Sequence, residues 1–307
     1  MPADKPLPKI AVCLTVYNGS VWLAEQLRSI LEQADVCVTV FVSIDRSEDG
    51  SEEWMNQQIA LDSRIQALPY GFEFGCAARN FFRILHEVDF SGFDYISFSD
   101  QDDIWLPHKL ARAHQLLSST EADAYSSNAM AFWPNGRQAL VKKSQPQRPW
   151  DFLFEAAGPG CTYVMKPKLV FALQDLLNQR WTDIQRVGMH DWFIYAFARA
   201  QGYQWVIDKH SEILYRQHGN NQLGVNSGLA AFIWRMRHIT SGWGFHQAAF
   251  IAELVGLGDH DFVRRWSRGG RLNLLWLMLH SGQCRRRFRD QVLFAVSCLV
   301  LAITGWR

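Results

Sequence analysis

Short apolar runs alternate with segments of helical periodicity through the first third of the chain. The runs are rich in β-branched and aromatic side chains, which predicts buried strands at residues 9–16, 36–44, 64–68 and 93–98. The predicted helices span residues 21–33, 52–60 and 76–88, with Ser51 capping the second. Apolar strands separated by helices predict a parallel sheet covered on both faces. The expected fold class is therefore α/β, with a mostly parallel, Rossmann-like sheet.

The rest of the chain has a mixed pattern and then becomes helical. We predict further strands at residues 122–132, 158–165 and 203–207, helices at residues 168–177 and 190–200, and a surface loop at residues 134–149. After about residue 225 the periodicity is helical. The expected organisation is one α/β domain, residues 1–225, followed by a helical C-terminal segment, residues 226–307.

The C-terminal segment contains a basic cluster, residues 285–289, followed by the apolar residues 292–303. The apolar stretch is shorter than the roughly 20 residues that a membrane span needs. A basic cluster beside an apolar helix suits peripheral contact with the cytoplasmic face of a membrane. The same helix would equally suit docking on the protein core or on a second subunit.

Composition limits the partners and the compartment. The 307 residues are 48% hydrophobic, enough for a large core, and a net charge of +1 argues against nucleic acid as the main partner. The six cysteines include no Cys-x-x-Cys pair, which favours free thiols in a reducing compartment. Residues 1–9 lack the apolar core of a secretory signal. We therefore expect a cytoplasmic protein, at most peripheral on the inner membrane.

Three carboxylates, Asp100, Asp102 and Asp103, lie within four residues directly after the fourth predicted strand. Like charges held together are costly unless a cation or hydrogen-bond donors offset them. Carboxylate oxygens suit Mg²⁺ or Mn²⁺, particularly when substrate phosphates complete the coordination shell. The alternative is a solvated acidic turn that caps the following helix, because turns and caps also favour Asp.

More polar residues follow the other predicted strands. In open α/β sheets, ligands bind beyond the carboxyl ends of the strands, so we expect these residues in one crevice. They are Thr15, Tyr17, Asn18, Asp45, the carboxylates at 100–103 and, across the next loop, Arg79. Two have structural alternatives, since Asp45 also suits a turn and Arg79 an ion pair with Glu73.

Four motifs, in this order, resemble those of the family 2 inverting glycosyltransferases. They are Thr-Val-Tyr-Asn-Gly at 15–19, Ser-Ile-Asp-Arg-Ser-Glu-Asp-Gly-Ser at 43–51, the segment 75–80, and Asp-Gln-Asp-Asp at 100–103. His-Asp-Trp at 190–192 and Tyr-Arg-Gln-His at 215–218 follow. The resemblance covers residues 9 to about 221 and implies a GT-A fold and a nucleotide-sugar donor. The variants at 99–105 and 215–221 resemble the branch of bacterial rhamnosyltransferases of cell-surface polysaccharide synthesis.

The resemblance implies roles for individual positions. The donor nucleotide sugar would bind at Thr15, Tyr17, Asn18, Asp45, Arg79, Asp100 and Gln101. A divalent cation, Mg²⁺ or Mn²⁺, would bind at Asp102, and Asp191 would be the general base. We expect His218 to be a further metal or phosphate contact, with a surface histidine as the alternative. We expect the acceptor or sugar pocket at Asp103, Trp105, Gly160, Cys161, His190 and Trp192, with core packing as the alternative for both tryptophans and Cys161.

Two positions depart from the family pattern. Ile44-Asp45 stands where the family often has two adjacent acids, and His190-Asp191 where it often has Glu-Asp. A neighbouring imidazolium would lower the pKa of Asp191, whereas a carboxylate would raise it.

The resemblance implies an inverting, metal-dependent glycosyltransferase. Its expected donor is dTDP-rhamnose or another nucleotide-activated sugar, and its expected acceptor is a hydroxyl of a lipid-linked surface polysaccharide precursor. A metal ion would stabilise the leaving diphosphate, and a single base would suffice for an inverting displacement. One alternative is a nucleotidyltransferase, although residues 15–20 lack the basic, glycine-rich phosphate loop that it would need. The other alternative is a non-catalytic protein that binds a nucleotide sugar or glycan within a membrane assembly.

Overall fold

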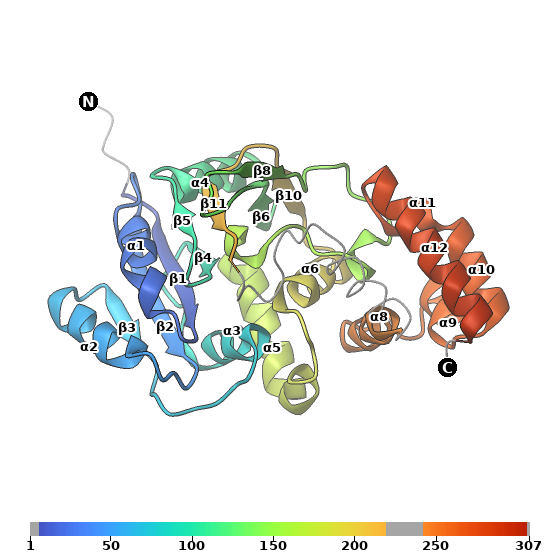
Figure 1. Cartoon of the computed structure of the whole chain (residues 1–307), viewed down its shortest axis with the longest axis horizontal. Coiled ribbons are helices and arrows are strands. Elements are labelled where there is room, and N and C mark those ends of the chain that lie inside the picture. Colours follow the sequence, from blue (N-terminus) through green and yellow to red (C-terminus); the bar gives the residue numbers. More distant parts are fainter. Residues whose placement is uncertain (1–5, 219–241, 306–307) are drawn as a thin grey trace. The chain divides into compact units, whose positions relative to one another are not determined.

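The four strands predicted in the first third of the chain pair with three later strands into a seven-stranded sheet in the order β10-β6-β9-β4-β1-β2-β3. The computed structural model describes residues 6–218 and 242–305 (Figure 1). β9 runs antiparallel to both of its neighbours, and the other neighbouring strands are parallel. The strands are β1 (Lys9–Val16), β2 (Cys37–Ile44), β3 (Ile65–Ala67), β4 (Tyr95–Ser99), β6 (Ala124–Ser127), β9 (Val164–Met165) and β10 (Trp205–Asp208). The predicted α/β class with a mostly parallel sheet is confirmed.

The register of the central strands aligns their carboxyl ends. Thr15 of β1 pairs with Ser43 of β2, and Leu14 pairs with Ser99 of β4. The loops that follow these three strands therefore leave the sheet beside one another. This is the edge at which the sequence predicts a crevice.

Helices cover both faces of the large sheet. They are α1 (Ser20–Leu31), α2 (Ser51–Leu61), α3 (Ala77–Glu87), α4 (Lys109–Ser119) and α5 (Pro167–Ile184). α6 (His190–Ala200) follows α5 in the chain. Alternate residues of β1, such as Val12 and Leu14, share a core cluster with Leu23 and Leu27 of α1. α3 contacts β1, β2 and α5 on the opposite face, where Phe81 of α3 packs on Phe98 of β4.

One predicted helix cap is wrong. α2 begins at Ser51 itself, and Gly50 holds the N-cap position with a φ of 82°, in the left-handed region that favours glycine. The Ser51 hydroxyl instead donates to Asp49 Oδ1 at 2.6 Å.

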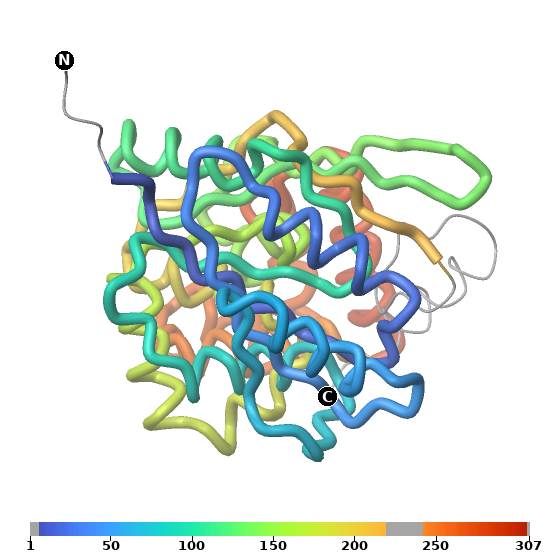
Figure 2. Tube along the Cα trace, turned by 90° about the vertical axis from the view of Figure 1, so that its left-hand side faces the viewer, coloured from blue at the N-terminus to red at the C-terminus, as the bar shows by residue number. Residues whose placement is uncertain are grey.

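A second, four-stranded sheet has the order β5-β11-β7-β8. Its strands are β5 (Ile104–Trp105), β7 (Ala129–Phe132), β8 (Gln138–Val141) and β11 (Ile213–Arg216). Two predictions are therefore wrong: residues 122–132 form two strands in different sheets, and the predicted loop at 134–149 contains β8. The β7–β8 hairpin projects as the light-green loop on the right of Figure 2.

Asn128 separates the two strands that the sequence predicts as one. Its backbone N–H donates to the carbonyl of Asp208, and its side-chain Nδ2 donates to the carbonyl of Lys209 at 2.7 Å. Its Oδ1 accepts the backbone N–H groups of Lys143 and Ser144. These bonds hold the chain where it leaves one sheet for the other.

The chain divides into two compact units. The first comprises Met1–Ser144, Gly158–Asp191 and Tyr203–Asn220, and the second comprises Gln145–Ala157, Trp192–Gly202 and Asn221–Arg307. The second unit contains the short 3₁₀ turn η1 (Asp151–Leu153) and the helices α8 (Trp243–Leu254), α9 (Asp261–Ser267), α10 (Arg271–Leu279), α11 (Ser281–Cys284) and α12 (Phe288–Thr304). The helical pattern predicted after residue 225 is confirmed for residues 242–305, whereas the predicted boundary itself lies outside the described residues.

A buried ion-pair cluster joins the three segments of the second unit. Arg286 is 3% exposed, and its guanidinium pairs with Asp151 at 3.1 Å and with Glu155 at 3.4 Å. Arg199 also pairs with Asp151, at 3.2 Å.

Within residues 6–218 and 242–305, no helix combines the length and the apolar character needed to cross a bilayer.

Candidate active site

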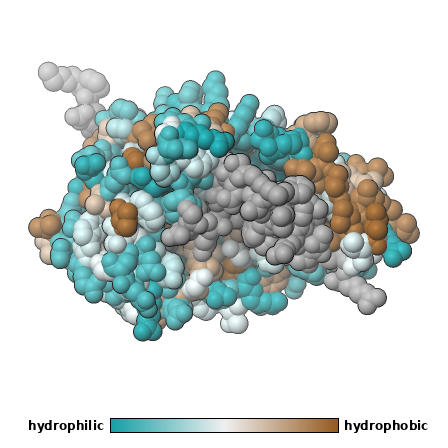
Figure 3. All heavy atoms as spheres, in the orientation of Figure 1, coloured by the Kyte–Doolittle hydropathy of each residue, from teal (hydrophilic) through white to brown (hydrophobic). Residues whose placement is uncertain are grey.

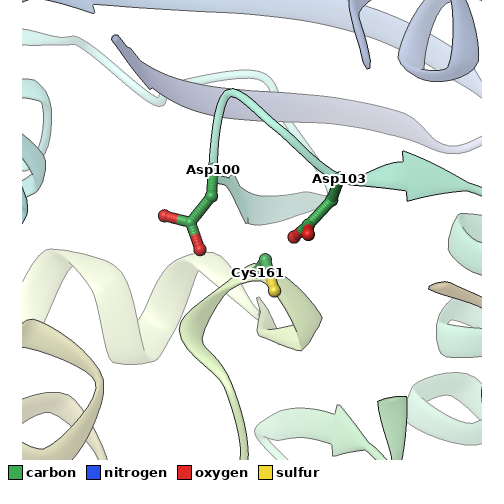
Figure 4. Close-up of side chains that lie close together, drawn as sticks. All are labelled: Asp100, Asp103 and Cys161. Carbon is green, nitrogen blue, oxygen red and sulfur yellow. The ribbon is translucent and has the colours of Figure 1, made fainter. Parts of the chain in front are cut away.

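The carboxylate turn between β4 and β5 lies in the first unit. Asp102 and Asp103 are buried and Asp100 is half-buried. Ligand atoms of Asp100, Asp103 and Cys161 lie within 4.8 Å of one another, and both carboxylates point toward the thiol, which comes from the 3₁₀ turn η2 (Gly160–Thr162) (Figure 4). Burial and the charges of Asp102 and Asp191 raise the pKa of Asp100 to about 7. Burial and the negative charges of Asp102 and Asp100 raise the pKa of Asp103 well above its usual value.

The turn has the properties of a divalent cation site. His218 Nε2 lies 2.7 Å from Asp102 Oδ2, so the structure brings the two expected metal ligands together. Asp103 Oδ2 is buried and has no hydrogen-bond partner among the described residues. Raised carboxyl pKa values and an unpaired buried oxygen both indicate that a bound cation would stabilise the ionised carboxylates here. Oxygen and imidazole ligands fit Mg²⁺ or Mn²⁺.

Arg216 of β11 fastens the turn to the second sheet. Its backbone N–H donates to Asp103 Oδ1 at 3.1 Å, and its Nε donates to the carbonyl of Asp102 at 2.8 Å. Its guanidinium also pairs with Glu25 of α1. Asp103 is therefore turned toward the protein, which gives no support to an acceptor contact by its side chain.

A buried lysine lies beneath the turn. Lys109 of α4 is 2% exposed, its Nζ donates to Ser97 Oγ at 3.3 Å, and the same atom lies 3.5 Å from the ring centroid of Trp105. Burial lowers the pKa of Lys109 to about 7. Trp105 is also 2% exposed and belongs to the core cluster. Its position favours the core alternative over the sugar pocket.

The Gln101 side chain clamps the loop after β1. Its Oε1 accepts the Tyr17 backbone N–H at 2.7 Å, and its Nε2 donates to the Tyr17 carbonyl at 2.9 Å. A Cβ on Gly19 would lie 2.3 Å from Gln101 Oε1, so this contact requires glycine at position 19. Tyr17 itself is exposed. Gln101 thus positions the loop, and Tyr17 offers its ring to a ligand.

Asn18 and Asp45 hold neighbouring loops in the same way. Asn18 Oδ1 accepts the backbone N–H of Glu48 at 2.9 Å, which ties the loop after β1 to the loop after β2. Asp45 is 4% exposed, and its two carboxylate oxygens accept the backbone N–H groups of Phe74 and Gly75 at 2.8 and 2.9 Å. The hydrogen bonds of both side chains therefore hold the loops together.

The other two expected donor-binding residues lie at the same edge. Thr15 is buried near the end of β1. Arg79 lies in the first turn of α3, where its Nε donates to the carbonyl of Gln185 and its Nη1 to the carbonyl of Phe74. Arg79 thus contacts backbone carbonyls, and not Glu73, its partner in the structural alternative.

His190 and Asp191 begin α6, and Gly160 packs against the histidine. The imidazole stacks on Phe81 with ring centroids 4.1 Å apart and meets the edge of Phe98. A Cβ on Gly160 would lie 2.4 Å from His190 Nε2. Burial lowers the pKa of His190 to about 3, so the ring is neutral at neutral pH. The side chain that precedes Asp191 is therefore a neutral ring, neither the imidazolium nor the carboxylate that the comparison with the family pattern considers.

Asp191 is the last residue of the first unit in this stretch, and its charge acts on Asp100. Its backbone carbonyl accepts the Tyr163 hydroxyl at 3.2 Å, which fixes the start of α6. Trp192 belongs to the second unit, where its indole N–H donates to the Phe152 carbonyl at 3.0 Å. That hydrogen bond favours the core alternative for Trp192.

Sequence reasoning missed several residues around the carboxylates. Trp22 of α1 stacks on His218. Tyr215 is half-buried, and burial, together with the nearby Cys161 and carboxylates, raises its pKa well above its usual value. Lys109 and Arg216 contribute positive groups. Tyr215 and Arg216 lie in a motif that the sequence analysis identified, but Trp22 and Lys109 fit helix patterns and carry no separate signal.

Comparisons with known proteins agree with this geometry. The model of glycosyl transferase family 2 matches residues 11–157. The chain is 39% identical over 291 residues to the dTDP-rhamnosyl transferase RfbG of Shigella flexneri, covering 94% of this chain and 100% of that protein.

Two solved structures share the fold. S. aureus TarS in complex with UDP has a TM-score of 0.57 and 13% identity, covering 96% of this chain and 88% of that chain. The mannosyltransferase PcManGT from Pyrobaculum calidifontis, in complex with GDP-Man and Mn²⁺, has a TM-score of 0.52 and 14% identity, covering 98% of this chain and 87% of that chain. At these identities the likeness shows a common GT-A-like fold. Because the full-length similarity to RfbG is much stronger, the chain belongs to glycosyl transferase family 2 and is an enzyme that transfers a sugar from a nucleotide-sugar donor.

Proposed function

We propose that the enzyme transfers L-rhamnose from dTDP-rhamnose to a hydroxyl of a cell-surface polysaccharide precursor, with inversion at the anomeric carbon. The observation that carries this proposal is the 39% identity to a dTDP-rhamnosyl transferase along 94% of the chain. The carboxylate turn and its neighbouring loops supply the groups that the reaction needs. Inversion follows from a single displacement, for which one base is sufficient.

The donor binds at the carboxyl edge of the large sheet. Tyr17 and Arg79 are exposed there and offer a ring and a cation to the nucleotide. Thr15 and Asp100 line the same edge. Asn18, Asp45 and Gln101 act on the donor indirectly, by fixing the loops that surround it.

Asp102 and His218 would hold a divalent cation, Mg²⁺ or Mn²⁺. When bound, the cation supplies positive charge to the diphosphate that leaves. Asp100 and Asp103 add negative charge around the same position, and this charge favours cation binding. Arg216 keeps Asp103 and the backbone of Asp102 in place.

Asp191 takes the proton from the acceptor hydroxyl as that oxygen attacks. It lies in the first turn of α6, where the helix dipole favours the carboxylate form. The neutral His190 adds no charge to this position and holds it by packing. Gly160 lies against both residues, and Cys161 lies beside Asp100 and Asp103. Both would bound the reacting sugar.

We assign the reaction to residues 1–225 and place the enzyme at the cytoplasmic face of the inner membrane. There it would meet a lipid-linked glycan acceptor, and the C-terminal segment, residues 226–307, would make a peripheral membrane contact. The basic cluster at 285–289 and the apolar helix α12 support this placement.

The test is transfer by the purified chain from dTDP-rhamnose to a membrane extract that contains lipid-linked glycan, followed by mass spectrometry. Wild type should add one deoxyhexose and release dTDP. Asp191→Asn should bind dTDP-rhamnose with nearly unchanged affinity and lose transfer at least about a hundredfold, as expected for a missing general base. Asp261→Asn is the matched control, because Asp261 also lies in the first turn of a helix, α9.

Each other outcome has a definite meaning. Full transfer by Asp191→Asn would remove Asp191 as the base. Transfer from another nucleotide sugar alone would overturn the choice of donor. Tight donor binding without turnover in any extract would favour the non-catalytic alternative.

A further inference from the structure

Helix α12 exposes apolar side chains along one side. Phe288, Val292, Val296, Leu299 and Ile303 follow one another at three- or four-residue spacing, so they lie on one side of the helix. Phe288 is 77% exposed and Ile303 is 69% exposed. Side chains of this kind on a solvent-facing stripe are unusual, because such stripes normally carry charged and polar residues.

The neighbouring helix α10 extends this surface. α10 packs along α12 in the second unit, and it exposes Leu272 and Leu279 to 81% and 78%. In Figure 3 hydrophobic residues gather over these helices. We call the following set the apolar face: Leu272, Leu279, Phe288, Val292, Leu293, Val296, Leu299 and Ile303.

The apolar face is distinct from the core of the second unit. The opposite side of α12 is already buried, through Phe294, Cys298 and Leu301 among others. From Gln291 to Thr304 the helix carries no charged side chain at all. A continuous exposed apolar surface of this kind marks an interaction site.

The charge around the apolar face identifies the kind of partner. Residues 261–305 contain eight arginines and two aspartates, and of the arginines Arg286 is buried in its ion pairs. Arg289 pairs with Asp290, whereas Arg271 and Arg287 are exposed and form no ion pair within the described residues. Two copies of this face would bring like charges together, which disfavours self-association. A surface that is anionic at the headgroups and apolar beneath them complements both features.

We infer that the apolar face docks on an anionic lipid bilayer, together with Arg271 and Arg287, which directly precede Leu272 and Phe288 in the chain. The inference rests on the proposed function and deepens its peripheral membrane contact. The apolar face would touch the acyl region, and the two arginines would touch lipid phosphates.

The experiment is flotation of the full chain with lipid vesicles. One set of vesicles is phosphatidylcholine alone, and the other also contains phosphatidylglycerol. Wild type should float with the anionic vesicles, and high salt should weaken that binding. Val292→Glu/Val296→Glu should weaken partitioning by at least about tenfold, because two charges would enter the apolar region. Arg271→Glu/Arg287→Glu should remove the preference for anionic vesicles.

Leu61→Glu is the matched control, since Leu61 is 81% exposed on α2 of the first unit and should leave flotation unchanged. Every variant is also tested for binding of dTDP-rhamnose. Unchanged donor binding with lost flotation supports the membrane inference. Donor binding that fails in wild type as well would overturn the proposed donor, and the flotation results would still decide the docking surface.

Two results would overturn the inference. One is flotation of Val292→Glu/Val296→Glu at the wild-type level. The other is a wild-type chain that ignores both kinds of vesicle and is dimeric by light scattering, with the same variant monomeric. That second result would show that another copy of the chain covers the apolar face.

Discussion

The imidazole of His218 stacks on the indole of Trp22, with ring centroids 4.1 Å apart and planes inclined by 19°. The same imidazole reaches Asp102 Oδ2 through its Nε2. Trp22 lies in the first turns of α1, directly after the loop that Gln101 clamps to the carboxylate turn. The stack therefore fixes the orientation of the His218 imidazole, a proposed metal ligand, toward Asp102.

Removing this stack should weaken metal binding without removing a ligand. An aromatic pair contributes about 0.5–1.5 kcal/mol, so Trp22→Leu should lower Mn²⁺ affinity by about two- to tenfold. Trp22→Phe keeps a ring beneath His218 and should remain close to wild type. Titration of Mn²⁺ followed by electron paramagnetic resonance measures the affinity directly. Equal affinities for wild type and Trp22→Leu would show that the stack does not position His218.

Gly160 should tolerate no side chain, because of its contact with His190. A Cβ at this position would lie 2.4 Å from Nε2 and 3.2 Å from Cε1 of an imidazole that Phe81 already holds. Gly160→Ala should cost about 1–3 kcal/mol of unfolding free energy, as overpacking does, and should reduce transfer because Asp191 moves with His190.

Denaturant unfolding and the rhamnosyl transfer assay measure these two effects. Gly244→Ala in α8 is the control, because a Cβ there meets no atom within 4 Å. If Gly160→Ala is as stable and as active as this control, the packing account of His190 is wrong.

The buried His190 should give the protein an acid-sensitive contribution to stability. The unfolded chain binds a proton at this ring below a pH of about 6.5, whereas the folded chain keeps the ring neutral down to a pH of about 3. The unfolded state therefore binds more protons in this window, and stability falls as the pH falls. One pKa unit corresponds to about 1.4 kcal/mol, so the loss by pH 5 is about 2 kcal/mol.

His190→Gln removes the titrating ring and should show a smaller loss of unfolding free energy between pH 7 and pH 5. Urea unfolding at several pH values measures both slopes, and the other titrating groups are common to the two proteins. If the unfolding free energies of the two proteins fall equally with pH, His190 binds its proton as readily in the folded protein as in the unfolded chain.

The sequence predicts the sheet well because each strand carries its own signal. Runs such as residues 9–16 are mostly apolar, and the register then places Tyr17, Asp45 and Asp100 at one edge. The break at Asn128 has no such signal, since the residues on both sides favour strands. The hydrogen bonds of Asn128 to Lys143, Ser144, Asp208 and Lys209 separate them, and these partners are distant in sequence.

The candidate site shows the same limit. Three acids directly after a strand are conspicuous, and His218 follows a recognisable motif, so both features carry a sequence signal. Lys109 carries none, because a lysine in the first turn of a helix is expected to face water. The charge of His190 has no sequence signal either, because its burial between Phe81, Phe98 and Gly160 depends on three separate segments.

The measurement that tests the central claim most directly is calorimetric binding of dTDP-rhamnose to the purified chain, with Mn²⁺ and with a chelator. The proposed site predicts tight binding with Mn²⁺, much weaker binding with chelator, and a similar loss in Asp102→Asn even when Mn²⁺ is present. Binding that is equally tight with chelator, or unaffected by Asp102→Asn, would contradict a metal-dependent donor site at the carboxylate turn.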